Sequence, residues 1–151
     1  MKVAIGSDEA GYALKCQLAE HLRSADVDVE DVGCYSTDPV LYPDMAEKVC
    51  EKITSGKADR GVLVCGTGIG MAITANKIPG IRAAVGHDSY SVERMVLSNN
   101  AQVITFGARI VSYVYASRLL DEWLSLEFVD GPSTSKVAEI SKVGERNGGA
   151  A

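Results

Sequence analysis

The sequence lacks several features that would point to particular classes of protein. No apolar run approaches the roughly 20 residues that a membrane-spanning helix requires. The four cysteines are dispersed without a C-x-x-C pair and there are only two histidines, which argues against a zinc site and a disulfide framework. The net charge is −5, so the excess of positive charge typical of nucleic-acid binding is missing. We therefore expect no metal, nucleic-acid or membrane partner.

What is present describes an ordinary globular domain. The 151 residues are 46% hydrophobic and 23% charged, which is a balance that can bury a full core. No linker or repeat divides the chain, so we predict one domain over residues 1–147 and a frayed tail at 148–151. A strand pattern begins at residue 2 with no signal peptide before it, and a cytoplasmic location is expected.

Short apolar runs alternate with segments in which hydrophobic residues recur at helical spacing. Strands are predicted at 2–7, 27–32, 62–65, 82–86 and 103–106. Helices are predicted at 14–24, 44–55, 69–77, 89–99 with Ser89 as its cap, 111–123, and from Ser133 onward. This alternation favours an α/β fold, a three-layer αβα sandwich with a five-stranded parallel sheet. The last helix has no strand to follow, and we expect it to cover a partner subunit.

The stretch around Cys65 organises the rest of the chain. The preceding run Val62–Val64 suits a buried parallel strand, and glycines at 66, 68 and 70 follow the cysteine before a helical segment. Glycines let main-chain N–H groups approach a ligand, and the amides of a helix start favour the thiolate form of a neighbouring cysteine. Cys65 is thus a candidate base or nucleophile; the alternative is a small, unreactive core residue. The glycine spacing matches neither a dinucleotide fingerprint nor a phosphate loop, so no nucleotide cofactor is expected.

In a parallel sheet, residues that come directly after the strands meet at one edge. That edge is predicted to gather Asp8 and Glu9, Cys65 to Gly70, His87 and Asp88, and Gly107 to Arg109. A carboxylate beside a thiolate forms an acid/base pair, amide donors suit an oxyanion, and an arginine binds phosphate. The alternatives stay open: Asp8 as a helix cap, Arg109 in a surface ion pair, and His87 as a solvated side chain.

Several blocks of sequence occur in a fixed order. They are G-x-D-x-A-G at 6–11, Y-P at 42–43, C-G-T-G-I-G at 65–70, A-N-K-I-P-G-I-R at 75–82, N-A at 100–101 and F-G-A-R at 106–109. This pattern resembles the ribose-5-phosphate isomerase B family, which includes the galactose-6-phosphate isomerase subunits. The resemblance runs from residue 2 to about residue 125. It implies a Rossmann-like fold and a metal-free, cofactor-free aldose–ketose isomerase of phosphosugars that works through an enediolate. It also implies a homodimer or tetramer with active sites shared between subunits.

The resemblance assigns roles position by position. Cys65 corresponds to the base that moves a proton between two carbons, and Asp8 to the group that handles the hydroxyl protons. Tyr42 and Asn100 correspond to substrate contacts. Arg109 corresponds to the phosphate-binding arginine, in its own site or in that of a neighbouring subunit. The enediolate oxygen is held by the loop, with the side chain of Thr67 assisting: Gly66, Thr67, Gly68, Ile69 and Gly70.

Three departures from the family pattern bear on the substrate. The chain has Glu9 where the family usually has histidine, and Pro132 and Lys136 where it has arginines. It has Asn99 at the position that resembles a histidine acid that opens the furanose ring of pentoses. Asparagine cannot donate and recover a proton in that way. The missing acid therefore indicates a substrate whose ring need not be opened.

A tetrose 4-phosphate has no free C4 hydroxyl with which to close a furanose. The segments 87–94 and 97–102 also resemble the branch of the family that interconverts D-erythrulose 4-phosphate and D-erythrose 4-phosphate in tetritol breakdown. We expect Lys136 to be near the phosphate of this shorter sugar, and His87 or Glu9 to take over part of the acid role. Ribose 5-phosphate is the alternative substrate. A non-catalytic phosphosugar-binding protein is the alternative from another functional class.

Overall fold

Strands and helices alternate along the chain in the computed structural model, which describes residues 1–148. The strands are β1 (Lys2–Ser7), β2 (Asp28–Asp31), β3 (Arg60–Cys65), β4 (Ala83–Val85) and β5 (Val103–Gly107). The helices are α1 (Tyr12–Ser24), α2 (Tyr42–Thr54), α3 (Ile69–Ala75), α4 (Ser89–Leu97), α5 (Tyr113–Ser125) and α6 (Thr134–Arg146). Each predicted element is present. Most of the predicted tail, residues 149–151, lies outside the described part.

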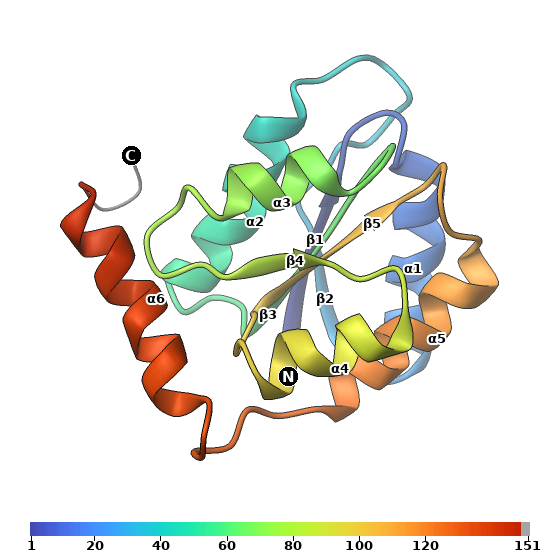
Figure 1. The fold of residues 1–151 in the computed structure, drawn as a ribbon. Helices are drawn as coiled ribbons and strands as arrows, with labels where there is room; N and C mark the ends of the chain where they lie inside the picture. The colour runs from blue at the N-terminus through green and yellow to red at the C-terminus, as the bar shows by residue number, and fades with distance from the viewer. Residues whose placement is uncertain (149–151) are drawn as a thin grey trace.

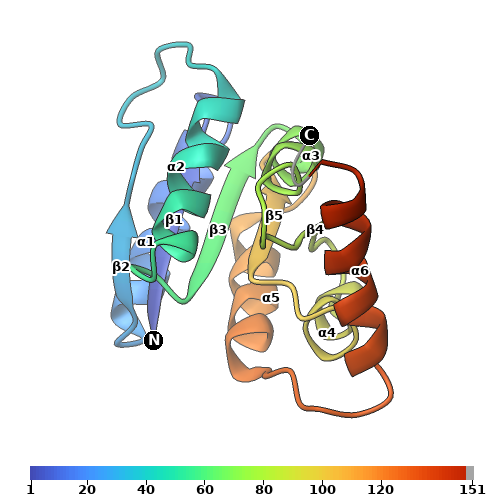
Figure 2. The ribbon, with the colours of Figure 1, turned by 90° about the vertical axis from the view of Figure 1, so that its left-hand side faces the viewer.

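The strands form one parallel sheet in the order β2-β1-β3-β5-β4. Helices α1, α4 and α5 cover one face, and α2 and α3 cover the other (Figures 1 and 2). The predicted three-layer α/β fold is therefore confirmed. Ser7 pairs with Val64 and Cys65 pairs with Gly107, so the carboxyl ends of the three inner strands end level with one another.

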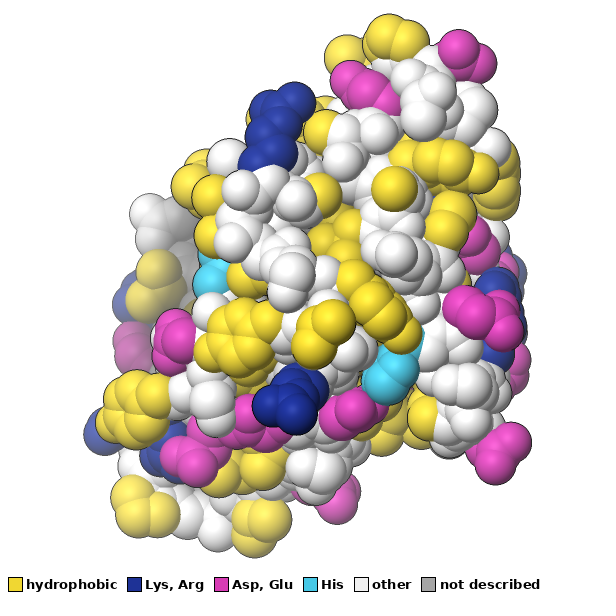
Figure 3. Space-filling view, turned by 90° about the vertical axis from the view of Figure 1, so that its right-hand side faces the viewer, with side chains coloured by type: hydrophobic (Ala, Val, Ile, Leu, Met, Phe, Trp, Pro, Cys, Tyr) yellow, Lys and Arg dark blue, Asp and Glu magenta, His cyan; other side chains and the backbone are white. Residues whose placement is uncertain are grey.

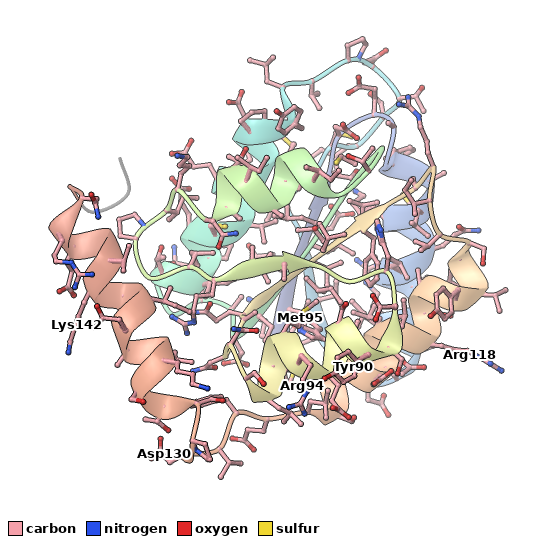
Figure 4. The ribbon with its side chains drawn as sticks, in the orientation of Figure 1. Tyr90, Arg94, Met95, Arg118, Asp130 and Lys142 are labelled. Carbon is pink, nitrogen blue, oxygen red and sulfur yellow. The ribbon has the colours of Figure 1, made fainter. Side chains whose placement is uncertain are left out.

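The core has two halves because the apolar sheet is buried on both faces. Leu14, Leu18 and Leu22 of α1 recur every fourth residue and pack with Trp123 on one face. On the other face α2 contributes its own buried residues, among them Cys50, as its helical spacing predicted. Figure 4 shows how α4 divides its side chains, with Met95 directed toward the sheet and Tyr90 and Arg94 directed away from it.

Two helix starts differ from the sequence prediction, each for a local reason. Helix α2 begins at Tyr42 rather than Asp44, because Pro43 fits the first turn of a helix, where its missing N–H costs nothing. Helix α4 is capped by Asp88 rather than Ser89. Asp88 has extended backbone and accepts a hydrogen bond from Ser91 N–H at 2.7 Å, whereas the Ser89 hydroxyl bonds Glu122.

Helix α6 stands apart from the sandwich. It lies beside the segment that leads into β4, and a cavity of about 530 Å³ separates Ile140 and Gly144 from Ile78 and Arg82. Val137 is its buried residue, while Ile140 and Val143 remain 46% exposed. That α6 covers a partner subunit stays a prediction. Within residues 1–148, none of the helices combines the length and apolar character needed to traverse a bilayer.

Candidate active site

Cys65 is the last residue of β3 and is 5% exposed. Its Sγ accepts a hydrogen bond of 3.1 Å from Gly68 N–H, so an amide of the glycine loop points at the sulfur. Gly68 has a φ of 77°, a left-handed conformation that glycine adopts without steric cost. The Thr105 hydroxyl fixes this turn by donating to Gly68 O at 2.8 Å. The chain thus turns its amide back onto the sulfur, as the candidate-base interpretation requires.

The start of α3 supplies further amide donors. The first N–H groups of a helix have no intrahelical partner. The Ile69 N–H donates to the Thr67 hydroxyl at 3.3 Å. Among residues 1–148, the N–H groups of Gly70 and Met71 have no such partner and can donate to an anionic oxygen. The Tyr42 ring packs so closely on Gly70 that a Cβ there would lie 2.8 Å from it. The Tyr42 ring therefore lies at the start of α3 beside the Cys65 loop, and its contact with substrate stays a prediction.

Asp8 comes directly after β1 and lies beside this loop. Its N–H donates to Val64 O at 3.2 Å, and its carboxylate accepts from Gly11 N–H at 2.9 Å. Asp8 thus closes the turn before α1, whose N-cap is Gly11 rather than Asp8, while it occupies the predicted edge. Burial raises its pKa above the ordinary value, against the opposing effects of the Gly11 bond and the Arg109 charge. A carboxyl group with a raised pKa exchanges protons more readily near neutral pH.

The segment after β5 joins the same edge. Ala108 N–H donates to Cys65 O at 2.8 Å, and Arg109 N–H donates to Gly66 O at 3.1 Å. The Arg109 guanidinium lies against Gly66, where a Cβ would be 3.0 Å from its nitrogen. Backbone hydrogen bonds, from Glu9 itself and from Val40, lower the pKa of Glu9, and the Arg109 charge acts in the same direction on Glu9 and Asp8. Arg109 is therefore next to the Cys65 loop of its own chain.

Glu9 and His87 are at this edge too, and each has a partner within the protein. The Glu9 carboxylate accepts from Val40 N–H at 3.1 Å and so fixes the loop that leads to Tyr42. The His87 ring accepts from Gly107 N–H through Nε2 at 2.9 Å, and burial lowers its pKa. Each side chain is half-buried and bonded to the backbone, and the acid role expected of His87 or Glu9 stays a prediction.

Three predicted site residues lie elsewhere in the chain. Asn99 and Asn100 precede β5, at the amino-end edge of the sheet, and Asn100 O accepts from Arg82 Nε at 2.8 Å. Lys136 is exposed in the first turn of α6, which begins near the same amino-end edge (Figure 1). Within its own chain, each of these three residues is away from the Cys65 edge, and their predicted roles stay predictions. The reason is that the residues before a parallel strand and the residues after it lie at opposite edges of the sheet.

Thr105 belongs to the site although it was not predicted. Its side chain is fully buried in β5 and holds the Gly68 turn through the hydrogen bond described above. A hydroxyl inside the otherwise apolar run Val103–Phe106 is the signal that could have found it, because a buried hydroxyl needs a partner. Two cavities, of about 530 and 410 Å³, are lined by other residues and do not include Cys65.

Residues 3–140 match the profile of a family described as Ribose/Galactose Isomerase. The chain belongs to this family. A Ribose-5-P isomerase B from Listeria innocua is 48% identical over 147 residues, which cover 97% of this chain and 99% of that protein. A D-erythrulose-4-phosphate isomerase 2 from Mycolicibacterium smegmatis is 46% identical over 146 residues, 95% of each chain. The solved ribose-5-phosphate isomerase B of Clostridium thermocellum superposes with a TM-score of 0.95 at 40% identity, covering 97% of this chain and 99% of its own.

The ribose/galactose isomerase family consists of sugar phosphate isomerases, and this chain is an aldose–ketose isomerase of a phosphosugar. The relatives with different substrates are almost equally similar to it, at 48% and 46% identity. Overall similarity therefore establishes the reaction class and leaves the length of the sugar to be argued from individual residues.

Proposed function

We propose that the enzyme interconverts D-erythrulose 4-phosphate and D-erythrose 4-phosphate. The observation that carries this proposal is Asn99, an exposed amide at the position that resembles the ring-opening histidine of pentose enzymes. An amide cannot serve as a general acid. A tetrose 4-phosphate is open-chain and needs no such acid, whereas ribose 5-phosphate closes into a furanose. The near-equal identities to relatives of both names are compatible with either substrate.

The geometry supports a reaction in which the thiolate of Cys65 is the base. It takes the proton from the carbon next to the carbonyl, and the resulting enediolate collects negative charge on oxygen. The N–H groups of Gly70 and Met71 are among the donors that can reach that oxygen. The thiol then returns the proton to the neighbouring carbon, while Asp8 moves the hydroxyl proton between the two oxygens. Arg109, beside Gly66, binds the phosphate.

We infer that a second copy of the chain completes the site. The predicted contacts Asn99, Asn100 and Lys136 are at the amino-end edge of their own sheet, so only another copy can bring them near Cys65. Large hydrophobic side chains are exposed near the carboxyl edge, among them Ile69 at 55%, Ile110 at 59% and Val114 at 66%. Figure 3, which faces the side of α5, shows hydrophobic side chains gathered across its middle. A homodimer, or a tetramer built from dimers, would bury such surface.

The substrate proposal is tested by measuring kcat/KM for D-erythrose 4-phosphate and D-ribose 5-phosphate in the same buffer. We expect a preference of about tenfold or more for the tetrose. The Asn99→His substitution should raise ribose turnover relative to tetrose turnover, and Asn99→Gln, which adds no acid, is the matched control. Faster turnover of ribose 5-phosphate by the unaltered protein would refute the tetrose proposal and make ribose 5-phosphate the substrate.

The role of Cys65 separates an enzyme from a binding protein. Cys65→Ala should abolish turnover and leave calorimetric binding of the sugar phosphate within about threefold, because the amides and Arg109 remain in place. Unchanged turnover would reject Cys65 as the base.

A shared site is tested by mixing Cys65→Ala chains with Asn100→Ala chains, each nearly inactive alone. Activity should reappear on mixing if a site draws on two copies, and its absence would contradict the shared site.

A further inference from the structure

The His87 ring is held in one protonation state by its contact with the backbone. Its Nε2 lies 2.9 Å from Gly107 N, and a backbone N–H can only donate. Nε2 therefore carries a lone pair, and the neutral ring carries its proton on Nδ1. A neutral imidazole has no readily lost proton, so His87 in this state does not supply the acid that was predicted from the sequence.

The peptide that His87 holds connects two parts of the active site. Gly107 pairs with Cys65 across the sheet and crosses so close to Thr67 that a Cβ would lie 2.7 Å from its backbone. The next two residues donate their N–H groups to Cys65 O and Gly66 O. Arg109, at the end of this segment, has its guanidinium against Gly66. The Gly107 peptide thus sets where the guanidinium is relative to the sulfur.

We propose that His87 is a positioning residue whose neutral imidazole, by accepting the Gly107 N–H, fixes the segment 107–109 and hence the distance between the phosphate site and Cys65. This inference rests on the proposed role of Arg109 in phosphate binding. Protonation of Nε2 would replace the acceptor with a second donor facing an N–H, and the hydrogen bond would be lost. Activity should therefore fall when His87 becomes charged at low pH.

The charged groups around the ring have opposing effects. Asp88, next in the chain, favours the protonated ring, but burial outweighs it and the pKa of His87 is lowered. On the far side of Gly107 are Cys65, its partner in the sheet register, and Gly66, against which the Arg109 guanidinium lies. Tyr90, in the first turn of α4, is 73% exposed. The ring is consequently expected to stay neutral over most of the physiological pH range.

The experiment compares His87→Gln with His87→Leu. The Gln side-chain oxygen can accept the Gly107 bond but does not titrate, whereas Leu fills similar space without an acceptor. We expect His87→Leu to lower kcat/KM about ten- to hundredfold, mainly through KM, because a buried N–H left without a partner displaces Arg109. His87→Gln should keep kcat/KM within about threefold of the unaltered protein. In its pH profile, the part of the decline at low pH that is due to titration of His87 should be absent. Equal damage by both substitutions would overturn the proposal.

A double-mutant cycle with Arg109→Met gives a second readout. If His87 acts through Arg109, then His87→Leu should have little further effect on KM in the Arg109→Met background. If the double variant instead raises KM by the product of the two single effects, His87 acts independently of Arg109 and the proposal is contradicted. Should His87→Leu fail to fold, His87→Asn replaces it, because its shorter side chain does not reach Gly107.

The assays use whichever sugar phosphate the enzyme converts fastest, so a pentose preference does not affect the test. Should no sugar phosphate be converted, the proposed function fails by itself. Binding of inorganic phosphate to the unaltered protein, His87→Gln and His87→Leu then tests positioning directly. Weaker binding by His87→Leu alone supports the proposal, and equal binding by all three overturns it.

Discussion

Removing the ammonium of Lys15 should destabilise the fold more than any surface substitution. The side chain is 1% exposed, and its Nζ donates to both carboxylate oxygens of Asp31, at 2.8 and 2.7 Å, and to Cys34 O at 2.7 Å. The rings of Tyr12 and Tyr35 are 5.3 and 5.5 Å from it. Lys15 thereby ties the loop after β2 to α1, near the start of the active-site edge.

The magnitude depends on the groups that Lys15→Met leaves without a partner. Methionine fills nearly the same space, but the Asp31 carboxylate and the Cys34 carbonyl lose their buried donor. Breaking one partner of a buried ion pair costs about 3–5 kcal/mol. Because the Asp31 side chain is 22% exposed, water can reach it in part. We therefore expect the lower end, about 3 kcal/mol, or a fall in Tm of roughly 6–12 °C for a domain of this size.

Urea unfolding at fixed protein concentration measures this change, since an oligomer's stability depends on concentration. The midpoint should fall with the m value unchanged. The cycle of Lys15→Met and Asp31→Asn should show a coupling of about 2 kcal/mol, because the second substitution removes the charge that the first leaves unpaired. A loss below about 1 kcal/mol, or additive effects, would refute the reasoning.

Two further predictions concern titration. Burial raises the pKa of Asp8 in the folded protein, so ionising Asp8 costs stability, and that cost appears as pH rises through its folded pKa. Asp8→Asn should accordingly raise Tm at pH 7–8, with a gain that vanishes below the ordinary carboxyl range; a gain constant across pH would contradict this. Burial also raises the pKa of Cys50 to about 12. Iodoacetamide at pH 8 should therefore label exposed Cys16 and leave Cys50 unlabelled until urea is added, as mass spectrometry can detect; labelling of both at equal rates would contradict the buried assignment.

The architecture could be predicted because its signals are local. Short apolar runs indicate the strands, and leucines at every fourth position indicate α1. The alternation of strands with helices implies a parallel sheet. The carboxyl-edge grouping of Asp8, Cys65, His87 and Arg109 is implied by that order alone. The start of α2 was predictable from Pro43, because proline in the first turn is itself a helix-start signal, whereas the cap of α4 depends on the extended backbone of Asp88, which the sequence does not specify.

The remainder of the site could not be predicted for a different reason. The partners of Glu9 and His87 are the backbone N–H groups of Val40 and Gly107. Both are distant in sequence, and the residue type does not reveal which backbone N–H group a side chain will bond. The hydroxyl of Thr105 in an apolar run indicates that it needs a partner, but the sequence does not say that the partner is the Gly68 carbonyl. Family resemblance assigns roles to Asn99 and Lys136 but cannot say which copy of the chain supplies them.

The register of the inner strands has a consequence for how such enzymes diversify. Asp8, Cys65 and Arg109 lie at the ends of neighbouring strands whose hydrogen-bond ladders set their spacing, and a shift of one residue would turn every side chain to the other face. Asn99 and Lys136 belong to a turn and an outlying helix that no ladder constrains. On the proposed assignment, substitutions in these peripheral segments could change the length of the sugar that is accepted without altering the spacing of Asp8, Cys65 and Arg109.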